Sequence, residues 1–445
     1  MPSSTNSPNN TAFNRRQVLQ ALGAGTSFWA APALWAQTTS TPEKIAAQAI
    51  SQRLGSGFNE NGRLVVVFLR GAYDGLSALV PHGDPNYYRL RPNIAIAAPD
   101  GTAQTTLALD AQFGLHPALA ALAPLWQQGV LGVIPAAGSP DPTRSHFDAQ
   151  LHWEVGMPGQ SSAGTGWLNR LAAPYSRTVA LGVGEANPLI LAGPAPVQLV
   201  PKGLAATRQG VLGDERTRQA VMNLYGGDDA LSKAFRAGAD SRMQTAQTLS
   251  AGASQGAMMN PMMNAEMVAA NNGAGSPQGL QLDAQHLGTL MRQNPLLRLG
   301  FLSAGGWDTH ANQGAATGNL AQNLGNLSAA LLQLRRDFSQ ANDVVMVCSE
   351  FGRTSAENGT RGTDHGHGNA LWLMGDAVHG GRWHGQWHGL AADRLHEGRD
   401  LPVHHDFRAV IAQVLQRTQG LDRPALDRLF PGFGWDPSLN GLMRA

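Results

Sequence analysis

The stretch NLAQNLGNLSAALLQLRRDFSQANDVVMVCSE, residues 319–350, joins an amphipathic helix to an apolar strand. Apolar residues recur every three or four positions in its first part: Leu320, Leu324, Leu327, Leu331, Leu334 and Phe338. This spacing predicts a helix with one buried face. Residues 344–348 are apolar throughout, which is typical of a strand covered on both faces. A helix that leads directly into such a strand indicates a mainly parallel α/β sheet.

Similar apolar runs recur along the chain, and each ends in a glycine-rich or polar turn. They are RLVVVFLRGAYDG (63–75), VLGVIPAAGSPD (130–141), TVALGVGE (178–185), LLRLGFLSAGGWDTH (296–310) and NALWLMGD (369–376). HDFRAVIAQVLQRTQG, residues 405–420, predicts another amphipathic helix that glycine ends. We therefore predict a three-layer α/β fold with a mainly parallel central sheet and helices on both faces.

A length of 445 residues allows two or three domains, or one α/β domain with insertions. We predict a single α/β domain over residues 61–435, with a helical insertion at about 205–290. The insertion carries a methionine group that would suit Cu(I), although a flexible contact surface is the favoured interpretation. Its members are Met258, Met259, Met262, Met263 and Met267.

The N-terminus reads NRRQVLQALGAGTSFWAAPALWAQ, with Arg15 and Arg16 before a short apolar stretch that ends in small residues. This pattern predicts a twin-arginine signal peptide over residues 1–36, followed by a linker over 37–60. The protein would then meet the twin-arginine translocase and be periplasmic or secreted. A membrane anchor is the alternative, but the stretch is shorter than the roughly 20 residues of a span. We expect no stable membrane span in the mature form.

Charge and cysteine content exclude several classes of site. The chain has 32 Lys and Arg against 31 Asp and Glu, so no basic excess points to nucleic acid. Cys348 is the one cysteine, which rules out an internal disulfide and a cysteine-rich zinc site. Its apolar surroundings favour a buried strand residue over a reactive thiol.

In a parallel α/β sheet, ligands bind beyond the carboxyl ends of the strands. Five segments there carry ligand-type side chains: Asp74; Thr143, Ser145 and His146; Asp308 and His310; Glu350 and Arg353; and Asp364, His365 and His367. Several have ordinary structural alternatives as well. Asp74 would suit a turn, Ser145 a helix cap, and Glu350 with Arg353 an ion pair.

GGWDTH and TDHGHG are the strongest metal candidates, since carboxylates and imidazoles suit Zn²⁺, Mn²⁺ or Fe. Asp364, His365 and His367 are too close in sequence for all three to bind one ion, so at least one would orient the others. His379, His384 and His388 alternate with Gly and Trp in a later loop. A surface loop or a carbohydrate- or partner-facing patch is favoured there over a second metal site.

Four motifs carry a resemblance to DUF1501, a family of twin-arginine-exported bacterial proteins. They are FLRGAYDGLSALVP, RSHFDAQLHWE, GGWDTH and SEFGRTSAENGTRGTDHGHGNALWLMG. That family in turn resembles the alkaline phosphatase and sulfatase superfamily, which uses a metal-bound nucleophile on phosphate or sulfate esters. The resemblance implies an alkaline-phosphatase-like core and one or two divalent ions, Zn²⁺ or Mn²⁺.

The resemblance also implies roles for particular residues. Asp74 would match the superfamily's first metal aspartate, and Ser145, or else Thr143, would match the nucleophile. Asp308, His310, Glu350 and either His365 or His367 would match later metal ligands, although Asp-x-His and Ser-Glu depart from the superfamily's usual spacing. His146 or Arg353 would neutralise the substrate's oxygens.

Three functional hypotheses follow. The first is a metal-dependent hydrolase of small or polymeric phosphate or sulfate esters, with Ser145 as the nucleophile. The second is an envelope binding or assembly protein that retains a metal or anion pocket without turnover. The third, copper handling through the methionine group, is the least favoured.

Overall fold

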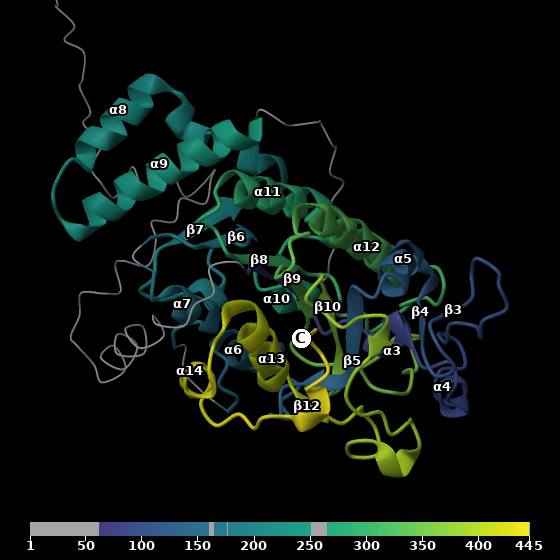
Figure 1. Cartoon of the computed structure of the whole chain (residues 1–445). Coiled ribbons are helices and arrows are strands. Elements are labelled where there is room, and N and C mark those ends of the chain that lie inside the picture. Colours follow the sequence, from purple (N-terminus) through teal and green to yellow (C-terminus); the bar gives the residue numbers. More distant parts are fainter. Residues whose placement is uncertain (1–61, 160–163, 176, 251–264, 445) are drawn as a thin grey trace, which may run out of the picture.

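A central sheet of nine strands organises the computed structural model, which describes residues 62–159, 164–175, 177–250 and 265–444 (Figure 1). In order along the sheet, the strands are β11 (Arg382–Trp383), β5 (Leu131–Gly138), β10 (Asn369–Met374), β9 (Val344–Cys348), β1 (Leu64–Leu69), β8 (Leu299–Ala304), β6 (Ala180–Gly184) and β7 (Val197–Pro201), with β12 (His405–Asp406) also paired to β5. β10 runs antiparallel to both β5 and β9, and the other pairings of this sheet are parallel.

Helices cover both faces of the sheet (Figure 1). The side chains of Val65, Val67 and Leu69 in β1 pack in one apolar cluster, and those of Leu64, Val66 and Phe68 pack in another. The first cluster includes α5 (Ala123–Gln127), α11 (Leu280–Gln293) and α12 (Asn319–Asp337); the second includes α6 (His146–Val155), α7 (Trp167–Ala172), α13 (Phe407–Gln419) and α14 (Arg423–Leu429). The predicted three-layer, mainly parallel α/β fold is confirmed.

The helix and strand predicted from residues 319–350 are α12 and β9. The α12 leucines at 320, 324, 327, 331 and 334 are all buried, because their spacing places them on the face that meets the sheet. β9 lies between β1 and β10, and its five residues are buried. The predicted buried position of Cys348 is confirmed, and burial raises the pKa of its thiol.

Smaller elements surround the sheet. α3 (Gly75–Ala78) and α4 (Pro85–Leu90) follow β1, and β2 (Leu79–Val80), β4 (Gly114–Leu115) and β3 (Leu107–Ala108) form a three-stranded antiparallel sheet. α8 (Glu215–Leu224) and α9 (Ala230–Ser250) share a separate apolar cluster and project from the β7 side of the molecule (Figure 1). α10 (Ala265–Ala270) follows.

The segment predicted as a helical insertion at about 205–290 thus holds α8, α9, α10 and most of α11. Of these, α11 is part of the layer that packs on the main sheet, through Leu287 and Met291 among others. The domain boundaries stay a prediction. The signal peptide, the linker and four of the five grouped methionines lie outside the described residues, and Met267 belongs to α10. In the described part of the chain, the helices are too short or too polar to cross a membrane.

Candidate metal centre

Five chain segments meet at the carboxyl edge of the parallel strands. β1, β5, β8 and β9 end at this edge, and the segments that follow them carry Asp74, His146 at the start of α6, Asp308 and Glu350 respectively. Because β10 runs antiparallel to its neighbours, its first residue lies at the same edge. His365, four residues before β10, therefore lies at the same edge as the segments that follow β1, β5, β8 and β9.

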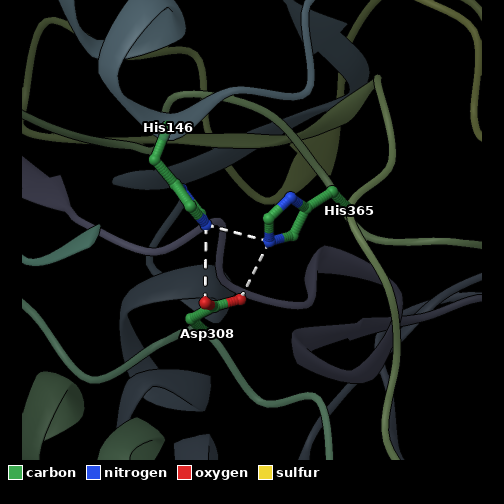
Figure 2. A group of neighbouring side chains, drawn as sticks. All are labelled: His146, Asp308 and His365. Carbon is green, nitrogen blue, oxygen red and sulfur yellow. Dashed lines mark hydrogen bonds and ion pairs between the residues drawn. The ribbon is translucent and has the colours of Figure 1, made fainter. Parts of the chain in front are cut away.

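His146, Asp308 and His365 point toward one another (Figure 2), and their donor atoms lie within 4.8 Å of one another. The two Nε2 atoms are 3.0 Å apart. Asp308 Oδ2 lies 3.5 Å from His146 Nε2, and Asp308 Oδ1 lies 3.2 Å from His365 Nε2. His310 joins them, with its Nε2 atom 2.9 Å from Asp308 Oδ1 and 3.0 Å from His365 Nε2. We call these four residues the histidine cluster.

Each histidine of the cluster has an oxygen acceptor at its other ring nitrogen. Nδ1 of His146 lies 2.8 Å from the Glu350 carboxylate, and Nδ1 of His310 lies 3.2 Å from the Asp364 carboxylate. Nδ1 of His365 lies 2.9 Å from the backbone carbonyl of Arg144. Since carboxylates and carbonyls accept hydrogen bonds, this network assigns the proton of each neutral imidazole to Nδ1. The Nε2 atoms face one another and Asp308: when protonated they donate to that carboxylate, and when deprotonated their lone pairs are free for a metal ion.

This arrangement of donors fits a transition-metal ion. Facing lone pairs repel one another unless a cation lies between them, and metal-bound histidines typically donate their second N–H to a carboxylate or carbonyl. Ligands of tetrahedral zinc lie roughly 3.3 Å apart, given bond lengths of about 2.0–2.1 Å. The distances of 3.0, 3.2 and 3.5 Å within the group of Figure 2 are close to that value. Imidazole donors favour Zn²⁺ over Mn²⁺.

The charges around Asp308 keep its carboxylate ionised. Burial alone would raise its pKa, but hydrogen bonds from the three histidines and the charge of Arg353 hold the pKa far below its usual range. Arg353 is buried and donates from Nη1 to Asp308 Oδ1 at 2.7 Å. Burial lowers the pKa of His146, but Asp308 and Glu350 outweigh burial and raise that pKa to about 9. The carboxylates of Asp308 and Glu350 thus favour a positive charge at His146, either a proton or a metal ion.

Glu350 contacts His146 on the side away from Asp308 and orients its ring. Its Oε1 atom accepts from His146 Nδ1 at 2.8 Å, from the Gly71 amide at 2.8 Å and from Gln150 Nε2 at 3.0 Å. Burial raises the pKa of Glu350, but the hydrogen bond and charge of His146 outweigh burial and lower that pKa to about 2. Glu350, predicted as a metal ligand, therefore reaches the cluster through His146.

A close backbone approach places His365. The Gly366 amide donates to the Gly352 carbonyl at 2.8 Å, and a short bridge pairs Arg353 with His365. A methyl group on Gly366 would overlap the Arg353 carbonyl. Glycine is therefore required where these two segments cross.

Other predicted site residues lie outside the histidine cluster. Asp74 forms a buried ion pair with Arg91, 2.6 Å from Nη1, and its further hydrogen-bond partners in the described chain are Ser77 and Gln313. The His367 ring lies against the His396 ring at a tilt of 36°, with centroids 4.5 Å apart, and burial lowers the pKa of His367 to about 4. The structure thus brings His146, Asp308, His310 and His365 together and places Asp74 and His367 elsewhere.

Ser145 caps α6, and its Oγ atom accepts from the Asp148 amide at 3.4 Å. Its neighbours on both sides contact His365. The Arg144 carbonyl accepts a hydrogen bond from His365 Nδ1, and His146 Nε2 lies close to His365 Nε2. Ser145 therefore lies beside the cluster, half-exposed. Thr143 Oγ1 accepts from the Ser145 amide at 3.2 Å.

The later loop of histidines and tryptophans serves mainly packing in the structure. His384 is buried, with Nε2 2.8 Å from the His379 carbonyl, and His388 is exposed. Trp383 and Trp387 meet Phe113 edge-on at centroid distances of 5.6 and 5.0 Å. The patch predicted for this loop stays a prediction.

Several residues that shape the cluster escaped the sequence reasoning. Gln150 follows His146 by one helical turn, and this four-residue spacing was a usable signal because it places both on one face. Arg144 acts through its backbone carbonyl, which carries no sequence signal. Arg70 is fully buried and donates from Nη1 to Gln150 Oε1 at 2.8 Å, which orients the amide that Gln150 presents to Glu350.

Comparison with known proteins places this chain in a family. No curated protein matches the chain. A sulfatase from Pseudoalteromonas sp., PsFucS1, is similar in structure at 10% identity and a TM-score of 0.35, covering 92% of this chain and 78% of the sulfatase. The alkaline phosphatase of the Antarctic bacterium TAB5 is similar at 12% identity and a TM-score of 0.30, covering 72% and 91%. A mutant of that phosphatase with Mg bound gives 11% and 0.32, with the same coverage. The model of the DUF1501 family, described as proteins of unknown function, matches residues 61–430, and the chain belongs to this family.

Proposed function

We propose that this protein binds a divalent transition metal, Zn²⁺ in the first place, through His146, Asp308 and His365, with His310 as a further ligand. One observation carries the proposal. The Nδ1 atoms of all three histidines meet acceptors, so that their Nε2 atoms face one another and the Asp308 carboxylate. A divalent cation in place of the Nε2 protons would be bound by the imidazoles and the carboxylate together.

We propose further that the metal serves the hydrolysis of a phosphate or sulfate ester. Partial exposure supports a catalytic over a structural ion, because catalytic sites keep an open coordination position. The side chains of His310 and His365 are 34% and 22% exposed, whereas that of His146 is 7% exposed. A bound divalent ion would lower the pKa of a hydroxyl or water beside it.

Ser145 is the proposed nucleophile. It sits half-exposed between two residues that contact His365, so its backbone lies beside the proposed metal, and its hydroxyl would reach the metal by turning away from the Asp148 amide that it caps. Its Oγ atom would form a bond to phosphorus or sulfur while the ester bond to the alcohol breaks, and the departing alcohol would take up a proton. Water would then release phosphate or sulfate and restore the serine.

One observation favours the alternative of a metal-binding protein without turnover. Three arginines contact the cluster, and all are already paired: Arg353 with Asp308, Arg144 with Asp400 at 2.7 Å and Glu397 at 2.6 Å, and Arg399, which donates to the His365 carbonyl, with Asp400 at 3.0 Å. An anionic substrate would have to displace Glu397, which is exposed, to reach Arg144.

The deciding experiment is elemental analysis of the purified mature chain, followed by turnover of chromogenic phosphate and sulfate esters. We expect stoichiometric metal that His365→Ala removes and that His388→Ala, a matched change of an exposed histidine, leaves in place. Ser145→Ala should retain the metal and abolish hydrolysis. Metal without turnover across both ester classes would favour the binding protein, and a metal-free wild type would refute both versions.

Export is proposed on the sequence pattern of residues 1–36. The twin-arginine route carries folded proteins, which suits a metal centre assembled from three separate segments. Replacing Arg15 and Arg16 together by lysine should keep the protein in the cytoplasm, as cell fractionation would show. Unchanged periplasmic recovery of that variant would contradict the proposed route.

A further inference from the structure

We propose that Gln313 is a positioning residue for the metal centre, acting on Asp308 through Thr363 and Arg353. This inference rests on the metal binding proposed above. Gln313 follows β8 in the same loop as Asp308 and is fully buried. Among the described residues, its side-chain hydrogen bonds go to Asp74, Ser77, Thr309 and Thr363 and not to the histidine cluster, so its effect would pass through the side chains between them.

A continuous chain of buried hydrogen bonds joins Gln313 to the cluster. Gln313 Oε1 accepts from Thr363 Oγ1 at 3.0 Å. Thr363 Oγ1 in turn accepts from Arg353 Nε at 3.1 Å, and Arg353 Nη1 donates to Asp308 Oδ1 at 2.7 Å. Arg353 Nη2 also donates to the Thr363 carbonyl. Two adjacent groups of the same guanidinium therefore depend on Thr363.

The Asp74 end of this series of hydrogen bonds determines which way the Gln313 amide faces. Gln313 Nε2 donates to Asp74 Oδ2 at 2.7 Å, and Asp74 is held ionised by Arg91, whose Nη1 and Nη2 donate at 2.6 and 3.0 Å. An ionised carboxylate only accepts, so the amide nitrogen of Gln313 must face it. The amide oxygen then faces Thr363.

The orientation of the Gln313 amide determines where the single hydroxyl proton of Thr363 goes. Thr363 donates that proton to Gln313 Oε1, so the lone pairs of Thr363 Oγ1 remain to accept from Arg353 Nε. Thr309 Oγ1 also donates to Gln313 Oε1, at 2.8 Å, so the amide oxygen accepts two hydrogen bonds. Arg353 is thereby held with Nη1 directed at Asp308, and the carboxylate is held in the orientation that meets the imidazoles. Asp74, predicted as a metal ligand, anchors this chain.

Removing an outer hydrogen-bond partner of a metal site typically costs about 10–100-fold in metal affinity. The test is a Co²⁺ titration of the metal-free mature chain, followed by visible absorption, which reports the coordination geometry as well as the dissociation constant. Gln313→Met should weaken Co²⁺ binding by up to about 10-fold, the low end of that range because two side chains lie between Gln313 and Asp308, and should change the visible bands. Thr363→Val should act in the same direction, and Thr363→Ser, which keeps the hydroxyl, should restore wild-type bands.

Gln419→Met is the matched control, because Gln419 is another buried glutamine whose amide donates to a carbonyl, that of Gly62 at 3.0 Å. It should lower thermal stability without changing Co²⁺ affinity. Wild-type affinity and bands in both Gln313→Met and Thr363→Val would overturn the inference while the proposed metal site stands. A wild type that binds no Co²⁺ would overturn both. If Gln313→Met does not fold, the contrast between Thr363→Val and Thr363→Ser decides.

Discussion

Replacing Asp283 by asparagine should stabilise the protein, and by more at high pH than at low pH. Asp283 lies on α11, is 4% exposed, and accepts from the Gly203 amide at 2.7 Å. Burial raises the pKa of its carboxyl from 3.8 to about 7, because the hydrogen bond and the charge of Lys202 only partly offset desolvation. Asparagine keeps the size and the acceptor oxygen but cannot ionise.

The sign and size of the effect follow from linkage. Between pH 3.8 and pH 7 the folded state holds a proton on Asp283 that the unfolded state has lost, so the free energy of unfolding falls as pH rises through this window. At about 1.4 kcal/mol per pKa unit, the full penalty is roughly 4 kcal/mol, and about 2.5 kcal/mol of it develops between pH 5 and pH 8. Asp283→Asn removes this penalty.

Urea unfolding of the mature chain at pH 5, 6.5 and 8, followed by circular dichroism, measures the difference between variant and wild type. Comparison at each pH cancels the other titrating groups. Asp228→Asn, a change of an exposed aspartate, controls for the loss of one negative charge. A stability difference for Asp283→Asn that does not grow from pH 5 to pH 8 would refute the reasoning.

Three further predictions concern the site and the core. Glu350→Gln should weaken metal binding by about 10–100-fold in an isothermal titration, because the orienting charge on His146 is lost; an unchanged dissociation constant would contradict this role. Gly366→Ala should lower the free energy of unfolding by about 3 kcal/mol, because the added methyl group overlaps the Arg353 carbonyl. Gly359→Ala, with open space around the new methyl group, should leave the melting temperature unchanged. Equal melting temperatures for the two variants would exclude the overlap. Leu324→Ala in α12 should cost about 2–5 kcal/mol in urea unfolding, and a cost under about 1 kcal/mol would show that the site collapses around the lost volume.

Local patterns were sufficient for the layered fold. The leucine spacing of residues 320–334 and the apolar run at 344–348 each predict one element, and their direct succession predicts the parallel arrangement that β9 adopts beside β1. The antiparallel direction of β10 was not predicted. Strand direction depends on the path of the connection from β9, and its composition alone does not reveal that path.

Residue type and strand position predicted the metal candidates but not their separate roles. His146, proposed from the sequence to meet substrate oxygens, lies in the cluster, because α6 begins beside His365. Asp74 has the same residue type and the same position after a strand, yet Arg91 neutralises it. That pairing joins a turn to the end of α4, which no local pattern reveals.

The sequence by itself determined the layered α/β class, the family and the set of segments that reach one edge of the sheet, because periodicity, run length and motifs are local properties of the chain. Only the tertiary structure decided which imidazole nitrogens face Asp308. Their orientation depends on acceptors at Glu350, Asp364 and the Arg144 carbonyl, and two of these three acceptors lie more than 200 residues along the chain from the histidine that each one orients. Packing, rather than local pattern, brings those acceptors within hydrogen-bond distance.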